Sequence, residues 1–268
     1  MMPRSAVKQA GPVRRIDEVD VQDLKDPLAA VDFVKYIYKS YRATEQKVRI
    51  SSSYISRQQD INEKMRSILI DWLVDVHLKF KLVPETLYLT VNLIDRFLMV
   101  KSVSRKHLQL VGVTAMLVAS KYEEIWAPEV RDFVYISDRA YNRDQILNME
   151  KIMLNSLKFN LTVPTHYHFL HRFLKVAGLA ENAEAVNYAS YLVELALPEY
   201  SMLRFRYSQV AAAAVYATMS MYEASYDALR QIHQHSTYAQ HEVSEVINAL
   251  AALAAAALSR PAYPVVRG

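Results

Sequence analysis

Apolar residues recur at every third or fourth position along most of the chain, a spacing that predicts α-helices rather than strands. The first such segment covers residues 27–44, where Val31, Val34 and Tyr38 would share one face. A polar stretch over 44–59 predicts a loop. Four longer helices are expected next, over residues 59–81, 84–99, 104–123 and 142–157. Five more are expected after a proline, over residues 165–176, 182–197, 205–222, 224–233 and 240–258.

The second group of helices repeats the first. When the chain is shifted by 99 residues, the small-residue segment 111–120 aligns with 210–219, so each group would have a helix of small residues at its centre. Small side chains allow neighbouring helices to pack closely on every side. The expected fold class is therefore all-α, with two tandem five-helix domains. The expected parts are a flexible tail over 1–25, an N-terminal helix and first domain over 26–160, and a second domain over 161–268.

Composition removes several classes of function. The chain has only four glycines and no cluster of them, whereas glycine-rich phosphate loops need several close together. It has no cysteine, which excludes disulfides and thiolate chemistry and favours an intracellular location. The basic residues behind the net charge of +4 are interspersed with acids, so no stripe for nucleic acid is expected. No apolar run reaches the roughly 18 residues that a membrane span requires, and we expect no membrane contact.

The histidines and acids do not form a pattern typical of catalysis or of metal binding. His166, His168 and His171 have spacings of two and five, which would spread the rings around a helix, whereas paired ligands favour a spacing of four. The sequence has no Ser–His–Asp signature and no Gly-x-Ser-x-Gly elbow. We therefore expect no enzyme activity, no catalytic residue, no metal and no cofactor.

The helix over 59–81 is the most informative segment, because its apolar residues cover about 280° of its circumference, whereas a surface helix shows an arc nearer 100°. Either this helix is buried at the centre of its domain, or one side of it is left exposed to dock a partner. That side would comprise Met65, Ile68, Leu69 and Trp72. Arg66 lies within the apolar arc and would need a buried acid, for which Asp95 is a candidate.

Four segments resemble the cyclin box, in matching order and spacing. They read MRSILIDWLV over 65–74, ETLYLTVNLIDRFL over 85–98, LQLVGVTAMLVASKYEE over 108–124 and MEK over 149–151. The segments KFKL over 79–82 and YISD over 135–138 are similar to those of mitotic B-type cyclins. The resemblance is strong over residues 31–177 and continues more thinly through the second domain.

The resemblance implies two stacked cyclin folds and a protein partner. Cyclins bind and activate a cyclin-dependent serine/threonine kinase as a heterodimer, and B-type members control the G2/M transition, in the nucleus and the cytoplasm. Lys121 and Glu150 fall on the family's lysine–glutamate pair, which grips a mobile helix of the kinase. The apolar positions beside this pair match Leu154, Phe159 and Leu161. From spacing alone, Lys121 is more typical of a lysine that caps the carbonyls of its own helix.

The resemblance also implies a surface that docks Arg-x-Leu segments of substrates or inhibitors. This docking patch comprises Met65, Ile68, Leu69, Trp72, Asp75, Leu108 and Gln109. Arg66 and Asp95 match an internal ion pair of the family, which has a structural role.

The chain departs from the family pattern in several places. Ser67 replaces the more common alanine, and no Arg-x-x-Leu destruction signal precedes residue 60. The alanine-rich end over 249–268 differs from the family pattern, so we expect the second fold to be truncated at its last helix. The alternative function is that of a cyclin-fold transcription factor that binds promoter DNA, which the absence of a basic stripe disfavours.

Overall fold

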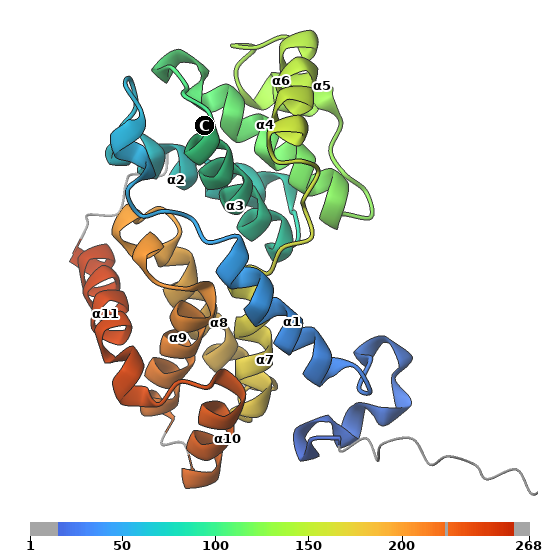
Figure 1. The fold of residues 1–268 in the computed structure, drawn as a ribbon, viewed down its shortest axis with the longest axis vertical. Helices are drawn as coiled ribbons and strands as arrows, with labels where there is room; N and C mark the ends of the chain where they lie inside the picture. The colour runs from blue at the N-terminus through green and yellow to red at the C-terminus, as the bar shows by residue number, and fades with distance from the viewer. Residues whose placement is uncertain (1–15, 223–224, 260–268) are drawn as a thin grey trace, which may run out of the picture.

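The computed structural model describes residues 16–222 and 225–259, and every regular element in these ranges is a helix (Figure 1). The expectation of an all-α fold is confirmed. The first domain contains α2 (Glu63–Phe80), α3 (Pro84–Val100), α4 (Arg105–Glu123), α5 (Val130–Ile136) and α6 (Arg143–Ser156). The second domain contains α7 (His166–Val176), α8 (Ala183–Ala196), α9 (Tyr207–Met221), α10 (Tyr226–Ser236) and α11 (Ser244–Ser259). Both domains are preceded by α1 (Val34–Lys47). Short 3-10 helices are η1 (Glu18–Lys25), η2 (Pro27–Ala29), η3 (Tyr54–Arg57), η4 (Tyr200–Arg204) and η5 (Gln240–Val243).

Local sequence explains where the helices of the first domain begin and end. Asn62 caps α2, because its side-chain oxygen accepts a hydrogen bond from the backbone N–H of Met65 at 3.0 Å. Lys81 ends α2 in the left-handed conformation, with a φ of 54°. Pro84 occupies the first turn of α3, where its missing N–H costs nothing.

Two elements of the first domain were not predicted from the sequence pattern. The helix α5 has only seven residues, too few to show a period, and its start is marked only by a capping box between Glu129 and Asp132. The 3-10 helix η3 lies in the stretch expected to be a loop, and it carries Tyr54, which is only 1% exposed.

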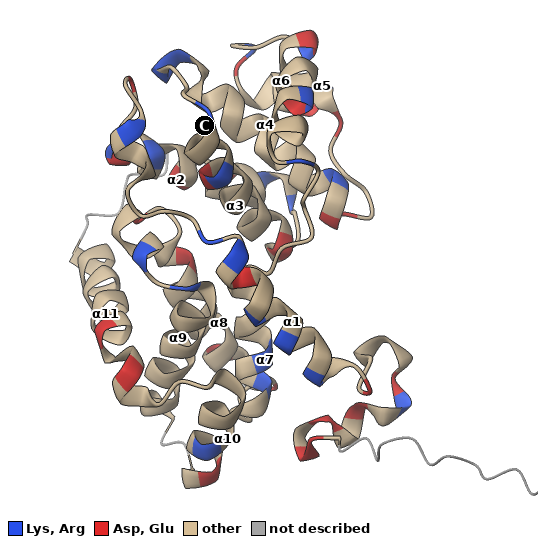
Figure 2. Cartoon of the chain, viewed as in Figure 1, with Lys and Arg blue, Asp and Glu red and all other residues tan. Residues whose placement is uncertain are grey.

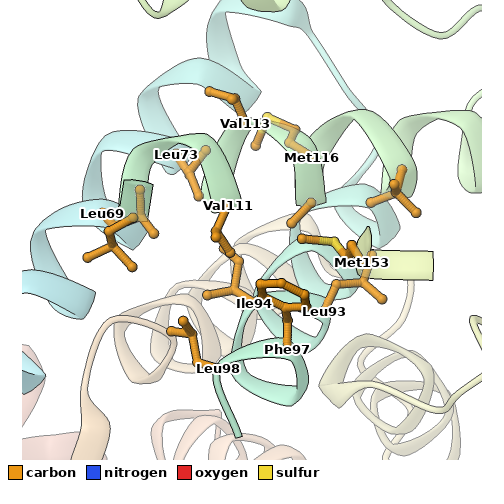
Figure 3. Close-up of a cluster of buried hydrophobic side chains, with 14 of the residues drawn as sticks. Leu69, Leu73, Leu93, Ile94, Phe97, Leu98, Val111, Val113, Met116 and Met153 are labelled. Carbon is orange, nitrogen blue, oxygen red and sulfur yellow. The ribbon is translucent and has the colours of Figure 1, made fainter. Parts of the chain in front are cut away.

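The core of the first domain surrounds α4, which packs against α2, α3, α5 and α6. In Figure 3, Leu73 of α2, Phe97 of α3 and Met116 of α4 belong to this buried cluster. A Cβ atom at Gly112 would lie 2.7 Å from the Cδ1 atom of Leu69, so the glycine allows α2 to approach α4 closely. The helix of small residues is therefore central, as the sequence predicts.

The second domain is arranged in the same way around α9, which packs against α7, α8 and α11. Residues 211–214, all alanine, are completely buried in α9. The last helix, expected to be truncated, is present as α11, whose Val246 and Leu250 are buried against this core. Residues 260–268 of the alanine-rich end lie outside the described residues.

One stretch in the described part of the chain, Gln240–Ser259, is long and apolar enough to cross a membrane by length and composition, with a mean hydropathy of 1.4. One such stretch is weak evidence for a membrane span, and 17% of its 18-residue window is buried within the protein. This stretch lies along the second domain, where its helix α11 packs against α8 and α9.

The helix α1 precedes the first domain in the sequence but packs on the second (Figure 1). The ring of Tyr41 meets that of Phe169 edge-on at 6.3 Å. Glu45, which is buried, accepts hydrogen bonds from the backbone N–H of Ser208 at 2.7 Å and from its hydroxyl at 2.8 Å. The carboxylate thus occupies the N-terminal end of α9, where the helix dipole favours negative charge.

Part of the segment expected to be a flexible tail over 1–25 is instead held against α7. Asp20 of η1 is only 2% exposed and accepts hydrogen bonds from Arg172 at 2.5 and 2.9 Å and from Lys175 at 2.9 Å. Sequence pattern gave no sign of this, because the cations lie about 150 positions further along the chain. Residues 1–15 lie outside the described residues.

Arg66 and Asp95 form a buried ion pair at the junction between the two domains, with side-chain exposures of 0% and 1%. The guanidinium donates to both carboxylate oxygens, at 2.6 and 2.7 Å. It also donates to the carbonyls of Leu197 and Pro198 in the second domain, at 3.1 Å each. The Tyr54 hydroxyl donates to Asp95 at 2.6 Å. The predicted partners therefore lie in contact, and every charge of the pair is hydrogen-bonded.

Replacing Asp95 tests this junction. We expect Asp95→Asn to lower the free energy of unfolding by about 3–5 kcal/mol, because it leaves the buried Arg66 charge without an anion. Urea denaturation followed by circular dichroism measures the change. Wild-type stability in the Asp95→Asn variant would contradict a stabilising role of the Arg66–Asp95 pair.

Tyr54→Phe removes only one charge-assisted hydrogen bond to Asp95 and should lower the free energy of unfolding by about 1.5–3 kcal/mol.

The attachment of η1 should depend on pH. Burial by itself raises the pKa of Asp20, but the hydrogen bonds and charges of Arg172 and Lys175 outweigh it and lower the pKa below its ordinary value. Because the folded pKa is lowered, the stabilisation is present above the unfolded pKa of about 3.9 and is lost as the pH falls through the folded pKa.

Asp20→Asn should therefore lower the free energy of unfolding by about 2 kcal/mol at pH 7, and the difference from wild type should shrink below pH 4. Urea titrations at pH 7 and pH 3 measure it. Glu18→Gln, at an exposed position of the same 3-10 helix, is the matched control. A difference between Asp20→Asn and wild type that is unchanged at pH 3 would show that the charge of Asp20 is irrelevant.

Candidate functional site

Lys121 and Glu150 come together on one face of the first domain. Lys121 lies in the last turn of α4, and Glu150 lies in the middle of α6, which packs against α4. The ammonium donates to the two carboxylate oxygens at 2.7 and 3.0 Å, so it is paired across helices instead of capping α4. The lysine side chain is 47% exposed and the glutamate 14%. Such an accessible pair contributes little to folding stability.

An unusual backbone follows α6 and carries an exposed aromatic ring. Lys158 and Phe159, which follow α6, both have left-handed φ angles of 55°. Each such residue costs of order 1–3 kcal/mol and persists only where its surroundings hold it. The Phe159 N–H is fixed by the carbonyl of Leu154 at 2.9 Å, yet its ring is 65% exposed. Leu154 and Leu161 are partly buried next to it. A strained backbone thus holds the apolar ring of Phe159 exposed to the solvent.

The loop that follows α4 adds two apolar residues that sequence reasoning missed. Ile125 and Trp126 are each 90% exposed. The start of the loop is fixed, because Glu124 accepts hydrogen bonds from the N–H of Val83 at 2.8 Å and from the hydroxyl of Thr86 at 2.6 Å. The sequence did offer one sign of these exposed residues, which is that two large apolar residues lie between predicted helices.

Lys121 also borders a hollow of about 510 Å³ formed with residues 127–131.

Most of the docking patch forms one groove between α2 and α4, with a volume of about 290 Å³. Its lining consists of Met65, Ile68, Leu69, Trp72, Arg105, Leu108 and Gln109. Ile68 is 60% exposed, whereas Leu69 and Leu108 are buried and form the floor. Asp75 is exposed further along α2 and does not line the groove. Arg105 was not predicted to lie here, and it bonds the carboxylate of Asp60 at 2.7 Å.

The histidines near the start of α7 do not converge on a common point. His166 lies between the domains, with its ring 4.4 Å from that of Tyr207 and 5.9 Å from that of Tyr88. Burial lowers the pKa of His166 to about 3, so the ring is neutral at physiological pH. His168 is hydrogen-bonded within the cap of α7. In the described ranges, no group of three or more His, Asp or Glu side chains is placed to hold a metal ion.

The fold places the chain in a known class. A viral cyclin from herpesvirus saimiri superimposes with a TM-score of 0.73 over 82% of this chain and 96% of that chain, at 18% sequence identity. The family model described as "Cyclin, N-terminal domain" matches residues 36–162, and that described as "Cyclin, C-terminal domain" matches residues 164–265. The chain belongs to the cyclin family.

Among cyclins, the chain is similar to B-type members, as the sequence predicts. It is 49% identical over 228 residues to a G2/mitotic-specific cyclin-1 of Medicago sativa subsp. varia, a match that covers 85% of this chain and 53% of that protein. It is 50% identical over 229 residues to Cyclin-B1-4 of Arabidopsis thaliana, with 85% and 59% covered. The chain spans rather more than half the length of these curated relatives.

Proposed function

We propose that this chain is the regulatory subunit of a cyclin-dependent serine/threonine kinase, which it binds and activates at the G2/M transition in the nucleus and cytoplasm. The observation that carries the proposal is the Lys121–Glu150 pair, in which the ammonium is 2.7 and 3.0 Å from the two carboxylate oxygens. The similarity to proteins named as mitotic and B-type cyclins supports the same conclusion. The chain itself supplies no catalytic group in this proposal.

The chemistry of the pair suits the end of a helix. An ammonium donates to free backbone carbonyls, and a carboxylate accepts from free N–H groups, which are the groups that helix ends leave unsatisfied. Phe159, Leu154 and Leu161 would bury apolar side chains of the same kinase helix. Because binding favours the one position of that helix that fits this face, it would shift the kinase towards its active state and order its activation loop.

The docking patch would act separately, by raising the local concentration of substrates. A leucine of an Arg-x-Leu segment fits an apolar groove of this size between α2 and α4. Asp75, exposed near the groove, would attract the arginine. Residues that bind the kinase and residues that bind the substrate would thus be separate, with Lys121 in the last turn of α4 and Leu108 and Gln109 in its first turns.

The first test removes the Lys121–Glu150 pair. We expect Lys121→Ala with Glu150→Ala to weaken kinase binding about 100-fold, because charge-assisted hydrogen bonds are lost at an interface closed to water. Calorimetric titration with an inactive mitotic cyclin-dependent kinase measures binding, and phosphorylation of a histone-type peptide measures activation.

The matched control is Arg230→Ala with Asp227→Ala, which removes an exposed ion pair of 2.8 Å on α10. It should leave binding, activation and the melting temperature unchanged. Equal affinity of the Lys121/Glu150 variant and wild type would overturn the assignment of the site. If the wild-type chain does not bind the kinase at all, a gel shift with promoter DNA tests the alternative function.

The second test concerns the docking patch. Ile68→Asp places a charge in the groove without disturbing the core, because Ile68 is 60% exposed. We expect the KM for a substrate with an Arg-x-Leu segment to rise about tenfold, and the rate on a peptide without the segment to stay constant. Leu78→Asp, on the same helix and 65% exposed but outside the groove, is the control. Equal losses on both substrates would contradict a docking role.

A further inference from the structure

A second groove lies on the other side of the start of α4. It has a volume of about 480 Å³ and is bounded by the end of α3, the turn over 101–104, the first two turns of α4 and the outer face of α6. Its floor is apolar and includes Val103, Leu110, Met149 and Ile152. Ile152 is 39% exposed, so the floor is open to a ligand. We call this surface the basic groove, because Lys101 and His107 line it and no acidic residue of the described ranges does.

The surroundings of the basic groove are positive as well. Lys101, Arg105, Lys106 and His107 fall within seven positions, and Figure 2 shows basic residues gathered at the start of α4. Helix N-termini usually carry acids, whereas the first turn of α4 carries none. Asp60 pairs with Arg105, but among the described residues neither Lys101 nor Lys106 has an acidic partner. Asp60 also accepts a hydrogen bond from the backbone N–H of Arg105 at 2.8 Å, so it offsets the dipole of α4 together with the charge of Arg105. The positive potential of this surface therefore comes from Lys101 and Lys106.

The basic groove and the docking patch flank the same stretch of α4. Ser104, His107 and Leu110 of α4 line the basic groove, whereas Arg105 and Leu108 line the docking patch. The two surfaces are thus opposite sides of the same two helical turns. An extended peptide advances about 3.3 Å per residue and a helix is about 10 Å wide, so about four residues lead from one groove to the other.

We propose that the basic groove binds an acidic peptide segment: one apolar side chain flanked by aspartate or glutamate, in the same partner that docks by its Arg-x-Leu segment. The apolar side chain enters the floor near Ile152, and the carboxylates face Lys101. This extends the proposed docking function, because a segment of about four residues would join two weak sites into one stronger one.

Three peptides labelled with fluorescein test the proposal against the full chain by fluorescence anisotropy. The short peptide contains Arg-x-Leu alone. The extended peptide adds four Gly/Ser residues and then Glu-Glu-Leu-Glu, and the acidic peptide contains only that last segment. We expect the extended peptide to bind wild type about tenfold more tightly than the short one, with the gain lost at high salt.

Lys101→Glu and, separately, Ile152→Ser should abolish this gain and leave the affinity of the short peptide unchanged. Lys39→Glu makes the same charge change at an exposed position of α1 and should preserve the gain. Equal affinities of the short and extended peptides for wild type would overturn the proposal. So would a gain that survives Lys101→Glu, or one obtained only when phosphoserine replaces the glutamates.

The acidic peptide separates this inference from the proposed function. If the short peptide fails to bind wild type, the Arg-x-Leu function falls. In that case the basic groove is still supported if the acidic peptide binds wild type at low salt and binds the Lys101→Glu variant more weakly. The basic groove is overturned if wild type and the Lys101→Glu variant bind the acidic peptide equally.

Discussion

The buried charge of Arg66 is the constraint on which the arrangement of this molecule depends. A guanidinium closed off from water must have all its donors satisfied, and here the acceptors come from α3 and from the carbonyls that follow α8. The interaction therefore fixes α2 against α3 and also against the second domain. Met65 and Leu69, which flank Arg66 on the same helix, line the docking patch. The position of that surface thus follows from a charge buried on its reverse side.

The helix α4 connects the two candidate surfaces. It has 19 residues and is therefore about 28 Å long. Its first turns supply Leu108 and Gln109 to the docking patch, and its last turn supplies Lys121 to the candidate kinase-binding face. Its middle is buried among four other helices, where Gly112 leaves room for α2. A rigid, buried middle holds the two exposed ends at a constant separation, which suits a protein that would hold a kinase and its substrate together.

The sequence predicted helices, their order and most of one groove, because these depend on local period and on a family pattern. The start of α3 at Pro84 was accurate, since proline marks a first turn. The position of α1 was not predictable, because an amphipathic pattern shows that one face is buried but not which domain covers it. The ion pair of Asp20 was not predictable either, because its partner Arg172 is 152 positions away in the chain. Asp75, chosen by resemblance, lies outside the groove that its neighbours form.

The seating of α1 on the second domain has a consequence for synthesis on the ribosome. Glu45 and its partner Ser208 are 163 residues apart in the chain. At the usual 5–20 residues per second, the nascent α1 would wait roughly 10–30 s before its binding surface leaves the exit tunnel. During that interval Tyr38, Tyr41 and the carboxylate of Glu45 are without their native covering. The first domain can fold in the meantime, so α1, which is made before both domains, is among the last elements to be locked in place.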